Sequence, residues 1–351
     1  MTVLVTGGAG FIGANVVDRL LQGGERVRIL DDLSRPGVEK NLQWLDERHH
    51  GRFELMRADV RDPAVVRDAV NDTTHVFHFA AQVATPASLF EPIADFAINA
   101  RGTLNLLEAI RAQPSRPSLI YTSSSKVYGT LADLPLRAGP LRYEPRDIVL
   151  AATGVDEKRP LAFHGPHGCS KGAADQYVLD YAHTFGLRAV VFRLSCVYGP
   201  RQRGHEDQGW VSHFLTHALR REPITIFGDG KQVRDLLYID DLVDAFWRVR
   251  GDIARLAGRA FNVGGGPTNT VSLLELLGYI DRMLGRAPRV GFEPARIADP
   301  RYYVSAGGAL SHATGWHART TVEEGLARLL DWLRQQPENG ARKTLEMGVI
   351  P

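Results

Sequence analysis

The sequence predicts an α/β protein with a doubly wound parallel sheet, followed by a smaller C-terminal α/β domain. Two observations predict this fold class. Short apolar runs alternate with amphipathic stretches through the first half of the chain, which is typical of parallel strands covered by helices on both faces. A glycine-rich turn joins the first apolar run to the first amphipathic stretch, as expected where a strand leads directly into a helix.

The expected strands of the sheet are short and strongly apolar. They cover Thr2–Thr6, Val27–Leu30, Phe53–Arg57, His75–Phe79, Ser118–Thr122 and Ala189–Leu194. Helices are expected at Ile12–Gln22, Asn99–Ala112, Lys171–Phe185, Asp240–Val249, Ser272–Leu284 and Val322–Gln335. The Gly- and Pro-rich segment from Leu131 to Pro166 breaks the alternation and predicts loops.

The composition limits the classes of function. With 42 Lys and Arg against 40 Asp and Glu, the net charge is +2 and no basic block is present, so nucleic-acid binding is not expected. No long uncharged apolar run predicts a membrane span. The chain opens on a strand pattern without a basic leader and has only two cysteines, which favours the reducing cytoplasm. No histidine, cysteine or carboxylate pattern predicts a metal site.

The strongest chemical signal is the glycine-rich turn. Gly7 permits a tight turn after the strand, Gly10 lets the backbone approach a pyrophosphate, and Gly13 lets the helix pack close to the strand. Asp31 ends the second strand at the spacing expected for an acid that binds a ribose hydroxyl and repels a 2′-phosphate. The alternative interpretation of the glycines is a plain strand-to-helix turn. For the choice of cofactor, Arg35 is the opposing signal, because a nearby arginine can accommodate a 2′-phosphate. We predict a Rossmann-type domain that binds NAD rather than NADP.

Asp59 and Val60 follow the third strand and are expected beside the adenine of the dinucleotide. The alternative for Asp59 is a loop acid that caps a turn. The order of the elements predicts that residues 1–192 and about 233–262 form the NAD-binding domain. Residues of about 193–232 and 263–340 are expected to form the substrate-binding domain, and 341–351 a polar tail.

Later motifs extend the pattern over residues 1 to about 335. They are Phe79-Ala80-Ala81, Asn99-x-x-Gly-Thr, Thr122-Ser-Ser-Ser-Lys-Val-Tyr-Gly129, Arg193-Leu-Ser-Cys-Val-Tyr-Gly-Pro-Arg201, Gly228-Asp-Gly-Lys-Gln-Val-Arg-Asp235, Tyr238-Ile-Asp-Asp241 and Phe261-Asn-Val-Gly264. Together they resemble the extended short-chain dehydrogenase/reductase superfamily, and within it the nucleotide-sugar epimerases and dehydratases. Lys126-Val-Tyr-Gly, Gly168-Cys-Ser-Lys-Gly-Ala-Ala-Asp-Gln-Tyr177 and Glu206-Asp-Gln-Gly-Trp210 are most similar to the CDP-paratose 2-epimerase (CDP-tyvelose epimerase) branch.

The resemblance implies transient hydride transfer between tightly bound NAD and a nucleotide-diphosphate sugar. In the family a tyrosine removes the hydroxyl proton, a lysine four residues later lowers its pKa and holds the nicotinamide ribose, and a serine or threonine binds the same oxygen. Ser124 and Lys171 match the serine and the lysine. The resemblance also assigns Phe11, Ile12, Ala80 and Ala81 to the cofactor site.

The sequence departs from this pattern at the base. His167, not tyrosine, lies four residues before Lys171, and no other tyrosine stands at that distance from a lysine. Imidazole can accept a proton, and Lys171 is expected to keep it neutral. Its nitrogen stops about 2 Å short of a phenol oxygen, whereas proton transfer needs about 2.6–3.2 Å or a bridging water. The two hypotheses are that His167 is the catalytic base, or that it only lines a pocket whose redox chemistry has changed or been lost.

Five cationic residues are expected to bind the substrate: Lys126, Arg193, Arg201, Arg234 and Arg296. Arg234 and Arg296 resemble the family's arginines that clamp a diphosphate, a task suited to a rigid bidentate cation, and surface ion pairs are the alternative. Ser125 and Lys126 stand where 4,6-dehydratases have Asp-Glu, which argues against that reaction. Cys169 is expected to be a small buried filler, with a thiol acid or base as the alternative.

The sequence therefore predicts an NAD-dependent nucleotide-sugar epimerase, nearest to a 2-epimerase. The alternatives are a sugar-nucleotide or nucleoside dehydratase, a 4-epimerase, or a non-catalytic NAD-binding sensor. A homodimer is expected through the helices after Asn99 and Lys171, as in the family. Their apolar side chains, which face either a partner or the chain's own core, are Leu104, Leu107, Ile110, Val178 and Tyr181.

Overall fold

The main sheet of the protein is parallel and has seven strands. The computed structural model describes residues 2–336, so the predicted tail at 341–351 lies outside the described residues. The strands run in the order β12-β8-β5-β4-β1-β2-β3. Their bounds are β1 Thr2–Thr6, β2 Arg26–Asp31, β3 Phe53–Arg57, β4 Thr73–His78, β5 Ser118–Ser124, β8 Ala189–Leu194 and β12 Ala260–Val263. The order reverses between β1 and β4, which is where ligands bind in open parallel sheets.

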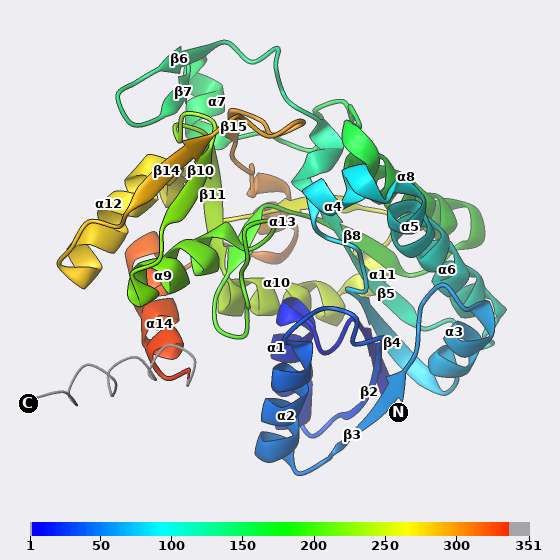
Figure 1. The fold of residues 1–351 in the computed structure, drawn as a ribbon. Coiled ribbons are helices and arrows are strands. Elements are labelled where there is room, and N and C mark those ends of the chain that lie inside the picture. The colour runs from blue at the N-terminus through cyan, green and yellow to red at the C-terminus, as the bar shows by residue number, and fades with distance from the viewer. Residues whose placement is uncertain (1, 337–351) are drawn as a thin grey trace, which may run out of the picture.

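Helices cover both faces of this sheet (Figure 1). On one face lie α3 Pro63–Val70, α6 Gly102–Ala112 and α8 Gly165–Phe185, with α4 Thr85–Phe90, α5 Pro92–Phe96 and a π-helical turn at Ala97–Arg101 beside them. On the other lie α1 Phe11–Gln22, α2 Val38–His49 and α10 Ile239–Gly251. Successive residues of β1 enter different cores: Val3 and Val5 pack with one cluster and Leu4 with the other. The strand is therefore apolar throughout, because both of its faces are covered.

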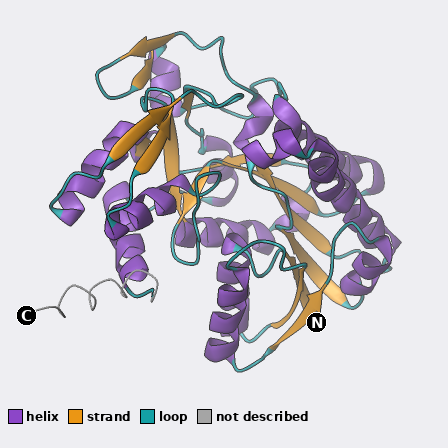
Figure 2. Ribbon diagram, in the orientation of Figure 1, coloured by secondary structure: helices purple, strands orange, loops and turns teal. Residues whose placement is uncertain are grey.

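The second part of the chain builds smaller sheets beside the main one (Figure 2). One sheet contains β9 Cys196–Tyr198, β11 Val233–Tyr238, β13 Thr270–Ser272 and β15 Tyr302–Tyr303, and a pair contains β10 Ile224–Phe227 and β14 Val290–Glu293. The helices of this part are α9 Trp210–Arg220, α11 Ile253–Leu256, α12 Leu273–Leu284, α13 Gly308–Thr314 and α14 Val322–Arg334. Short 3₁₀ turns occur at Ser125–Tyr128 and Pro267–Asn269. Within residues 2–336, no helix is long and apolar enough to cross a membrane.

The structure differs from the prediction in three segments. The region predicted to be loops contains the hairpin β6 Leu136–Ala138 and β7 Tyr143–Pro145 and the helix α7 Ile148–Thr153. Strands of three residues are too short to leave a periodic pattern in the sequence. Helix α8 begins at Gly165, six residues before the predicted start, because Pro166 is compatible with the first turn of a helix. Residues of about 233–262 were predicted to belong to the NAD-binding domain. Of the two strands in this range, β12 joins the main sheet, but β11 pairs with strands of the smaller sheet.

The apolar side chains that were expected to face either a dimer partner or the chain's own core lie in the core. Leu107, Ile110 and Val178 are fully buried and Tyr181 is 7% exposed. All four belong to the core between the sheet and helices α3, α6 and α8, and Leu104 packs against that core. The helical spacing of apolar residues marks the face that packs on the sheet, so it carries no information about a partner here.

A buried ion pair joins the main sheet to α8. Arg193 on β8 is 4% exposed and donates through Nε and Nη2 to the two carboxylate oxygens of Asp175, each at 2.9 Å. Its Nη1 also donates to the hydroxyl of Tyr128 at 3.0 Å. Such a bidentate pair satisfies both charges where water cannot. Arg193, predicted to bind substrate, is therefore committed to the core.

We expect Arg193→Met to lower the free energy of unfolding by about 3–5 kcal/mol, because it leaves the carboxylate of Asp175 buried and unpaired. Urea denaturation followed by circular dichroism measures this loss. The matched control is Arg193→Met with Asp175→Leu, which removes both charges and should recover most of the lost stability. A wild-type unfolding midpoint for the single variant would contradict a structural role for the pair.

Candidate active site

A cavity of about 1130 Å³ opens along the carboxyl edge of the main sheet, between the sheet and the second part of the chain. Its walls include residues at the ends of β1, β2, β4, β5 and β8, and residues of the smaller sheets such as Phe227, Arg234 and Tyr303. This is the position expected for a ligand at the topological switch point of a parallel sheet. Most residues predicted to form the active site line this one cavity.

The glycine turn at one end of the cavity has the shape needed to receive an anion. Gly7 has φ +67°, and a Cβ there would lie 2.6 Å from the backbone nitrogen of Ala80. A Cβ on Gly13 would lie 2.1 Å from the carbonyl oxygen of Gly7, so only glycine lets α1 approach β1 this closely. Gly10 is the N-cap of α1, and no side chain caps the free amides there. Gly10, Phe11, Ile12 and Gly13 all line the cavity, so these amides can bind a phosphate group.

Asp31 holds the glycine turn in place and lines the same cavity. One carboxylate oxygen accepts from the backbone nitrogen of Ala9 at 3.0 Å and the other from that of Leu33 at 2.9 Å. Burial raises the pKa of Asp31, and the two amide hydrogen bonds partly offset the effect. A carboxylate has further lone pairs, so Asp31 can still accept from a ligand hydroxyl. Arg35 also lines the cavity, with Nη2 3.4 Å from Nε2 of His205.

The other residues predicted to contact a dinucleotide also line the cavity. They are Asp59, Val60, Ala80 and Ala81. Asp59 accepts from the backbone nitrogen of Arg61 at 2.8 Å and forms an ion pair with its guanidinium at 2.5 Å. Asp59 thus caps a turn and also faces the cavity, so the two interpretations of this residue are compatible.

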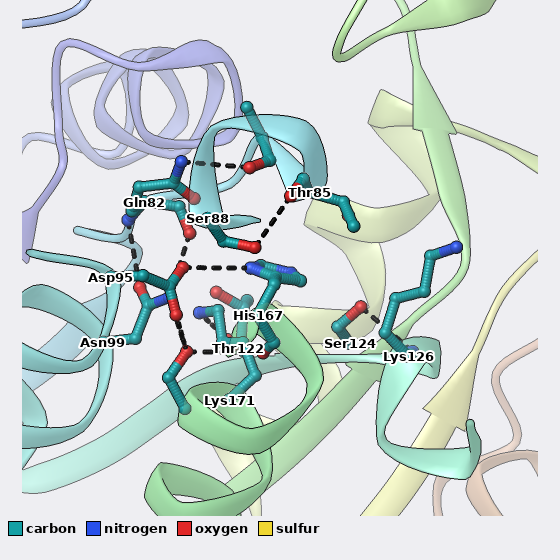
Figure 3. Close-up of polar contacts among 12 residues, drawn as sticks. Gln82, Thr85, Ser88, Asp95, Asn99, Thr122, Ser124, Lys126, His167 and Lys171 are labelled. Atoms are coloured by element: carbon teal, nitrogen blue, oxygen red, sulfur yellow. Dashed lines mark hydrogen bonds and ion pairs between the residues drawn. The ribbon is translucent and has the colours of Figure 1, made fainter. Parts of the chain in front are cut away.

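Ser124, His167 and Lys171 line the cavity and lie near one another (Figure 3). Ser124 is the last residue of β5, and its hydroxyl accepts from the backbone nitrogen of Lys126 at 3.2 Å. His167 and Lys171 lie one turn apart on α8 and are 6% and 5% exposed. The ammonium of Lys171 donates to the backbone oxygen of Thr122 at 2.9 Å. The helix and the strand end therefore bring the three side chains together, as the sequence predicted.

Burial changes the titration of the two α8 side chains. It lowers the pKa of Lys171 from 10.5 to about 8, although the charges of Asp95 and Asp175 oppose the shift. Burial also lowers the pKa of His167, and the charge of Lys171 adds to this, while the carboxylate of Asp95 acts in the opposite direction. At neutral pH the imidazole is neutral and can accept a proton.

Sequence reasoning missed Asp95, which lies beside His167, to its left in Figure 3. Asp95 is on α5, is 1% exposed, and has Oδ1 3.7 Å from Nδ1 of His167. Its other neighbours are Asn99, which donates to Oδ1 at 3.1 Å, and Ser170, whose hydroxyl donates to Oδ2. The available signal was an aspartate four residues before Asn99 in a helical segment, a spacing that brings the two side chains together.

Three of the five cations predicted to bind substrate line the cavity: Lys126, Arg234 and Arg296. The side chains of Lys126 and Arg234 both lie 2.8 Å from Oδ1 of Asp299. Burial opposes ionisation of this carboxyl, but the charges of Arg234 and Lys126 outweigh it and hold the pKa of Asp299 well below its usual range. The guanidinium of Arg296 stacks 4.0 Å from the ring centre of Phe227 and donates to the backbone oxygen of Glu206 at 3.0 Å.

The structure places two other predictions away from this site. Arg201 stacks its guanidinium 3.7 Å from the ring centre of Trp44 and is outside the cavity wall, as is Arg193. Cys169 is exposed rather than buried, because it points away from the face of α8 that packs on the sheet, and it does not line the cavity. Among residues 2–336, no group of three or more His, Cys, Asp or Glu side chains is arranged to hold a metal ion.

Known proteins resemble this chain in sequence and in fold. The sequence profile described as "NAD dependent epimerase/dehydratase family" matches residues 3–264. The CDP-paratose 2-epimerase of Salmonella typhi is 39% identical over 346 residues, which cover 95% of this chain and 99% of that protein. The crystal structure of the Thermus thermophilus UDP-glucose 4-epimerase with NAD has a TM-score of 0.80 and 32% identity, over 95% of this chain and 99% of that one. A Streptomyces venezuelae dTDP-glucose 4,6-dehydratase with NAD has a TM-score of 0.82 and 26% identity, over 96% and 98%.

The pKa of Lys171 predicts a pH dependence of stability. Its pKa is 10.5 ordinarily and about 8 in the folded protein, so between these values the unfolded chain binds more protons and stability rises with pH. The buried charge costs stability below about pH 8, and this cost disappears toward pH 10.5. We therefore expect the stability of Lys171→Met relative to wild type to be highest at pH 7 and to decrease as the pH rises to 10.

Urea unfolding of both proteins at several pH values between 7 and 10 measures this difference. The matched control is Lys158→Met, because Lys158 is exposed, so its substitution should change stability by the same small amount at every pH. If the difference for Lys171→Met is equally independent of pH, the ammonium is not desolvated as the structure indicates.

Proposed function

The chain belongs to the NAD dependent epimerase/dehydratase family, and from this premise we propose that it is an NAD-dependent 2-epimerase of a nucleotide-diphosphate sugar, with His167 as its base. One observation carries the choice of reaction: the 39% identity to a CDP-paratose 2-epimerase, which extends over both parts of the chain. Relatives that are 4-epimerases and 4,6-dehydratases leave those reactions as alternatives. Ser125 and Lys126 disfavour 4,6-dehydration, because a dehydratase of this family would have Asp-Glu there.

The cavity fits NAD at the end formed by the glycine turn. The uncapped amides of α1 would bind the pyrophosphate, Asp31 the adenosine ribose, and Lys171 the nicotinamide ribose. Bound NAD supplies a hydride acceptor that takes a hydride from a sugar carbon and later returns it. Structural relatives that hold NAD in the same fold support this choice of cofactor.

The cationic part of the cavity wall fits the diphosphate of the sugar nucleotide. It consists of three positive side chains, those of Lys126, Arg234 and Arg296. Asp299 already binds the first two, so a diphosphate would share or replace that carboxylate as their partner. These cations would fix the nucleotide so that the sugar lies between them and His167.

The reaction then needs two proton transfers that involve the protein, one from the sugar hydroxyl to His167 and one back to the same oxygen. As the hydride leaves C2, His167 would accept the proton of the C2 hydroxyl, and Ser124 would donate a hydrogen bond to the same oxygen. The product of this half-reaction is a ketone at C2. When the hydride returns to the opposite face, the imidazolium would give its proton back to the oxygen, so the enzyme and cofactor end unchanged.

We expect the protein to convert CDP-paratose, or a related CDP-, UDP-, GDP- or dTDP-linked sugar, into its C2 epimer. Proton NMR of reactions run in D₂O measures this conversion. The C2 hydrogen should remain protium in the product, because a hydride that moves to NAD and back does not exchange with water. Deuterium at C2 would exclude transient oxidation of that carbon, and binding of NAD and sugar nucleotides without any turnover across the panel would favour the sensor.

The same assay tests the base. His167→Phe should lower kcat by at least about 100-fold with little change in KM, because the lost interaction is made in the transition state. Activity should fall as the pH drops through the imidazole pKa, which lies below its ordinary 6.5 because His167 is buried. His167→Tyr restores the family's residue and should retain activity. Near-normal turnover by His167→Phe would remove the imidazole from the mechanism.

Because of Asp31, the Kd for NAD should be lower than the Kd for NADP by at least about tenfold, which corresponds to about 1.4 kcal/mol of binding free energy. The carboxylate of Asp31 would repel a 2′-phosphate, and Asp31→Asn should reduce the preference while keeping a similar shape. Titration calorimetry with both dinucleotides measures the ratio. The control is Arg35→Ala, which should weaken only NADP. Equal or tighter binding of NADP by the wild type would mean that Arg35, not Asp31, determines the choice.

We keep the homodimer and the cytoplasmic location as part of this proposal. Exposed apolar side chains on the packed helices α4, α5 and α8 support an interface there instead of at the buried positions first predicted. They are Phe90, Ile93, Phe96 and Tyr177, which are 86%, 84%, 56% and 46% exposed.

A further inference from the structure

His167 lies between a buried carboxylate and the cavity. Its imidazole lines the cavity, and Nδ1 points to Oδ1 of Asp95 at 3.7 Å (Figure 3). Nδ1 is buried and makes no hydrogen bond with any described residue. In an imidazole the two nitrogens point in different directions, so a ring that turns Nδ1 toward Asp95 directs Nε2 away from it. An Nδ1–H bonded to Asp95 leaves Nε2 as the acceptor.

Neutral donors hold the Asp95 carboxylate in place. Ser170 donates to Oδ2 and Asn99 to Oδ1, and Asn99 is fixed in turn because its own oxygen accepts from the backbone nitrogen of Gln82 at 2.9 Å. Because Ser170 and Asn99 are neutral, neither of them compensates the negative charge of Asp95. Asn99 lies in the π-helical turn after α5, and such turns are frequent at functional sites.

We infer that Asp95 is the positioning residue of His167: it accepts the Nδ1 proton, keeps Nε2 free to act as the base, and stabilises the imidazolium that forms. This inference rests on the proposed function. A phenolate base has one oxygen and needs no partner for a second ring atom, whereas an imidazole base needs its tautomer fixed. The 3.7 Å separation is slightly longer than a hydrogen bond, and catalytic hydrogen bonds are often long before the ligand binds.

The charges around the imidazole come from three elements. Asp95 approaches from α5, Lys171 from the next turn of α8, and Lys126 from the turn after β5. The two lysines disfavour the imidazolium and Asp95 favours it. Removal of the Asp95 charge should therefore make the imidazole harder to protonate and should also destabilise the protonated state through which the reaction passes.

We expect Asp95→Asn to lower kcat/KM by about 100-fold, mainly through kcat, and to move the acid limb of the pH profile to lower pH. The matched control is Glu91→Gln, which neutralises an exposed carboxylate at the N-cap of the same helix, outside the cavity wall, and should stay within about threefold of wild type. The second comparison uses the His167→Tyr background, where Asp95→Asn should change kcat/KM by less than about threefold. An equal loss in both backgrounds would overturn the inference, because it is the result of a purely structural role for Asp95.

Nitrogen-15 NMR of histidine-labelled protein gives a readout that does not depend on turnover. The His167 signals, assigned as those missing in His167→Phe, should report the Nδ1–H tautomer in the wild type. The Nε2–H tautomer would overturn the inference even if His167→Phe is inactive. Conversely, an active His167→Phe together with the Nδ1–H tautomer would reject His167 as the base and leave the Asp95 contact intact, so the two failures are distinguishable.

Discussion

The burial of three ionisable side chains on one stripe of α8 is the constraint on which the site depends. His167, Lys171 and Asp175 follow one another at four-residue spacing and are 6%, 5% and 0% exposed. Buried ionisable groups are costly unless each has a partner. The fold provides one for each: Asp95 faces His167, the backbone oxygen of Thr122 binds Lys171, and Arg193 binds Asp175. The position of α8 against β5, β8 and α5 is therefore fixed by polar contacts as well as by apolar packing.

This arrangement makes the protonation of His167 and that of Lys171 dependent on each other. The lowered pKa of Lys171, about 8, still leaves it charged at neutral pH. That charge favours the neutral form of His167, which is the form that can accept a proton. The same charge opposes the imidazolium that would result from accepting it. Asp95 supplies the opposing negative charge. An imidazole at this position thus needs two neighbours of opposite sign, whereas a phenolate is stabilised by the lysine alone.

The sequence was most informative where one residue type is the only one that fits. The strands of the main sheet are apolar on both faces, and the glycines at Gly7 and Gly13 leave no room for a Cβ, so both features could be read without a structure. Ser124, His167 and Lys171 were also predicted together, through the family resemblance, and the four-residue spacing of His167 and Lys171 places both on one face of a helix. The sequence was least informative where a residue type suits two roles. Arg193 has the charge to bind a phosphate, but its use depends on Asp175, and only the fold brings that partner to it.

A single turn connects the two ends of the cavity. In the 3₁₀ turn after β5, the backbone nitrogen of Lys126 donates to the hydroxyl of Ser124, and the side chain of the same lysine reaches Asp299 of the second part of the chain. Asp299 in turn binds Arg234 on β11. The edge of the main sheet and the cationic end of the cavity are thus linked through a continuous series of hydrogen bonds and ion pairs. In the proposed reaction, this link would set the distance between the sugar and the diphosphate, so ligands would be selected by length as well as by charge.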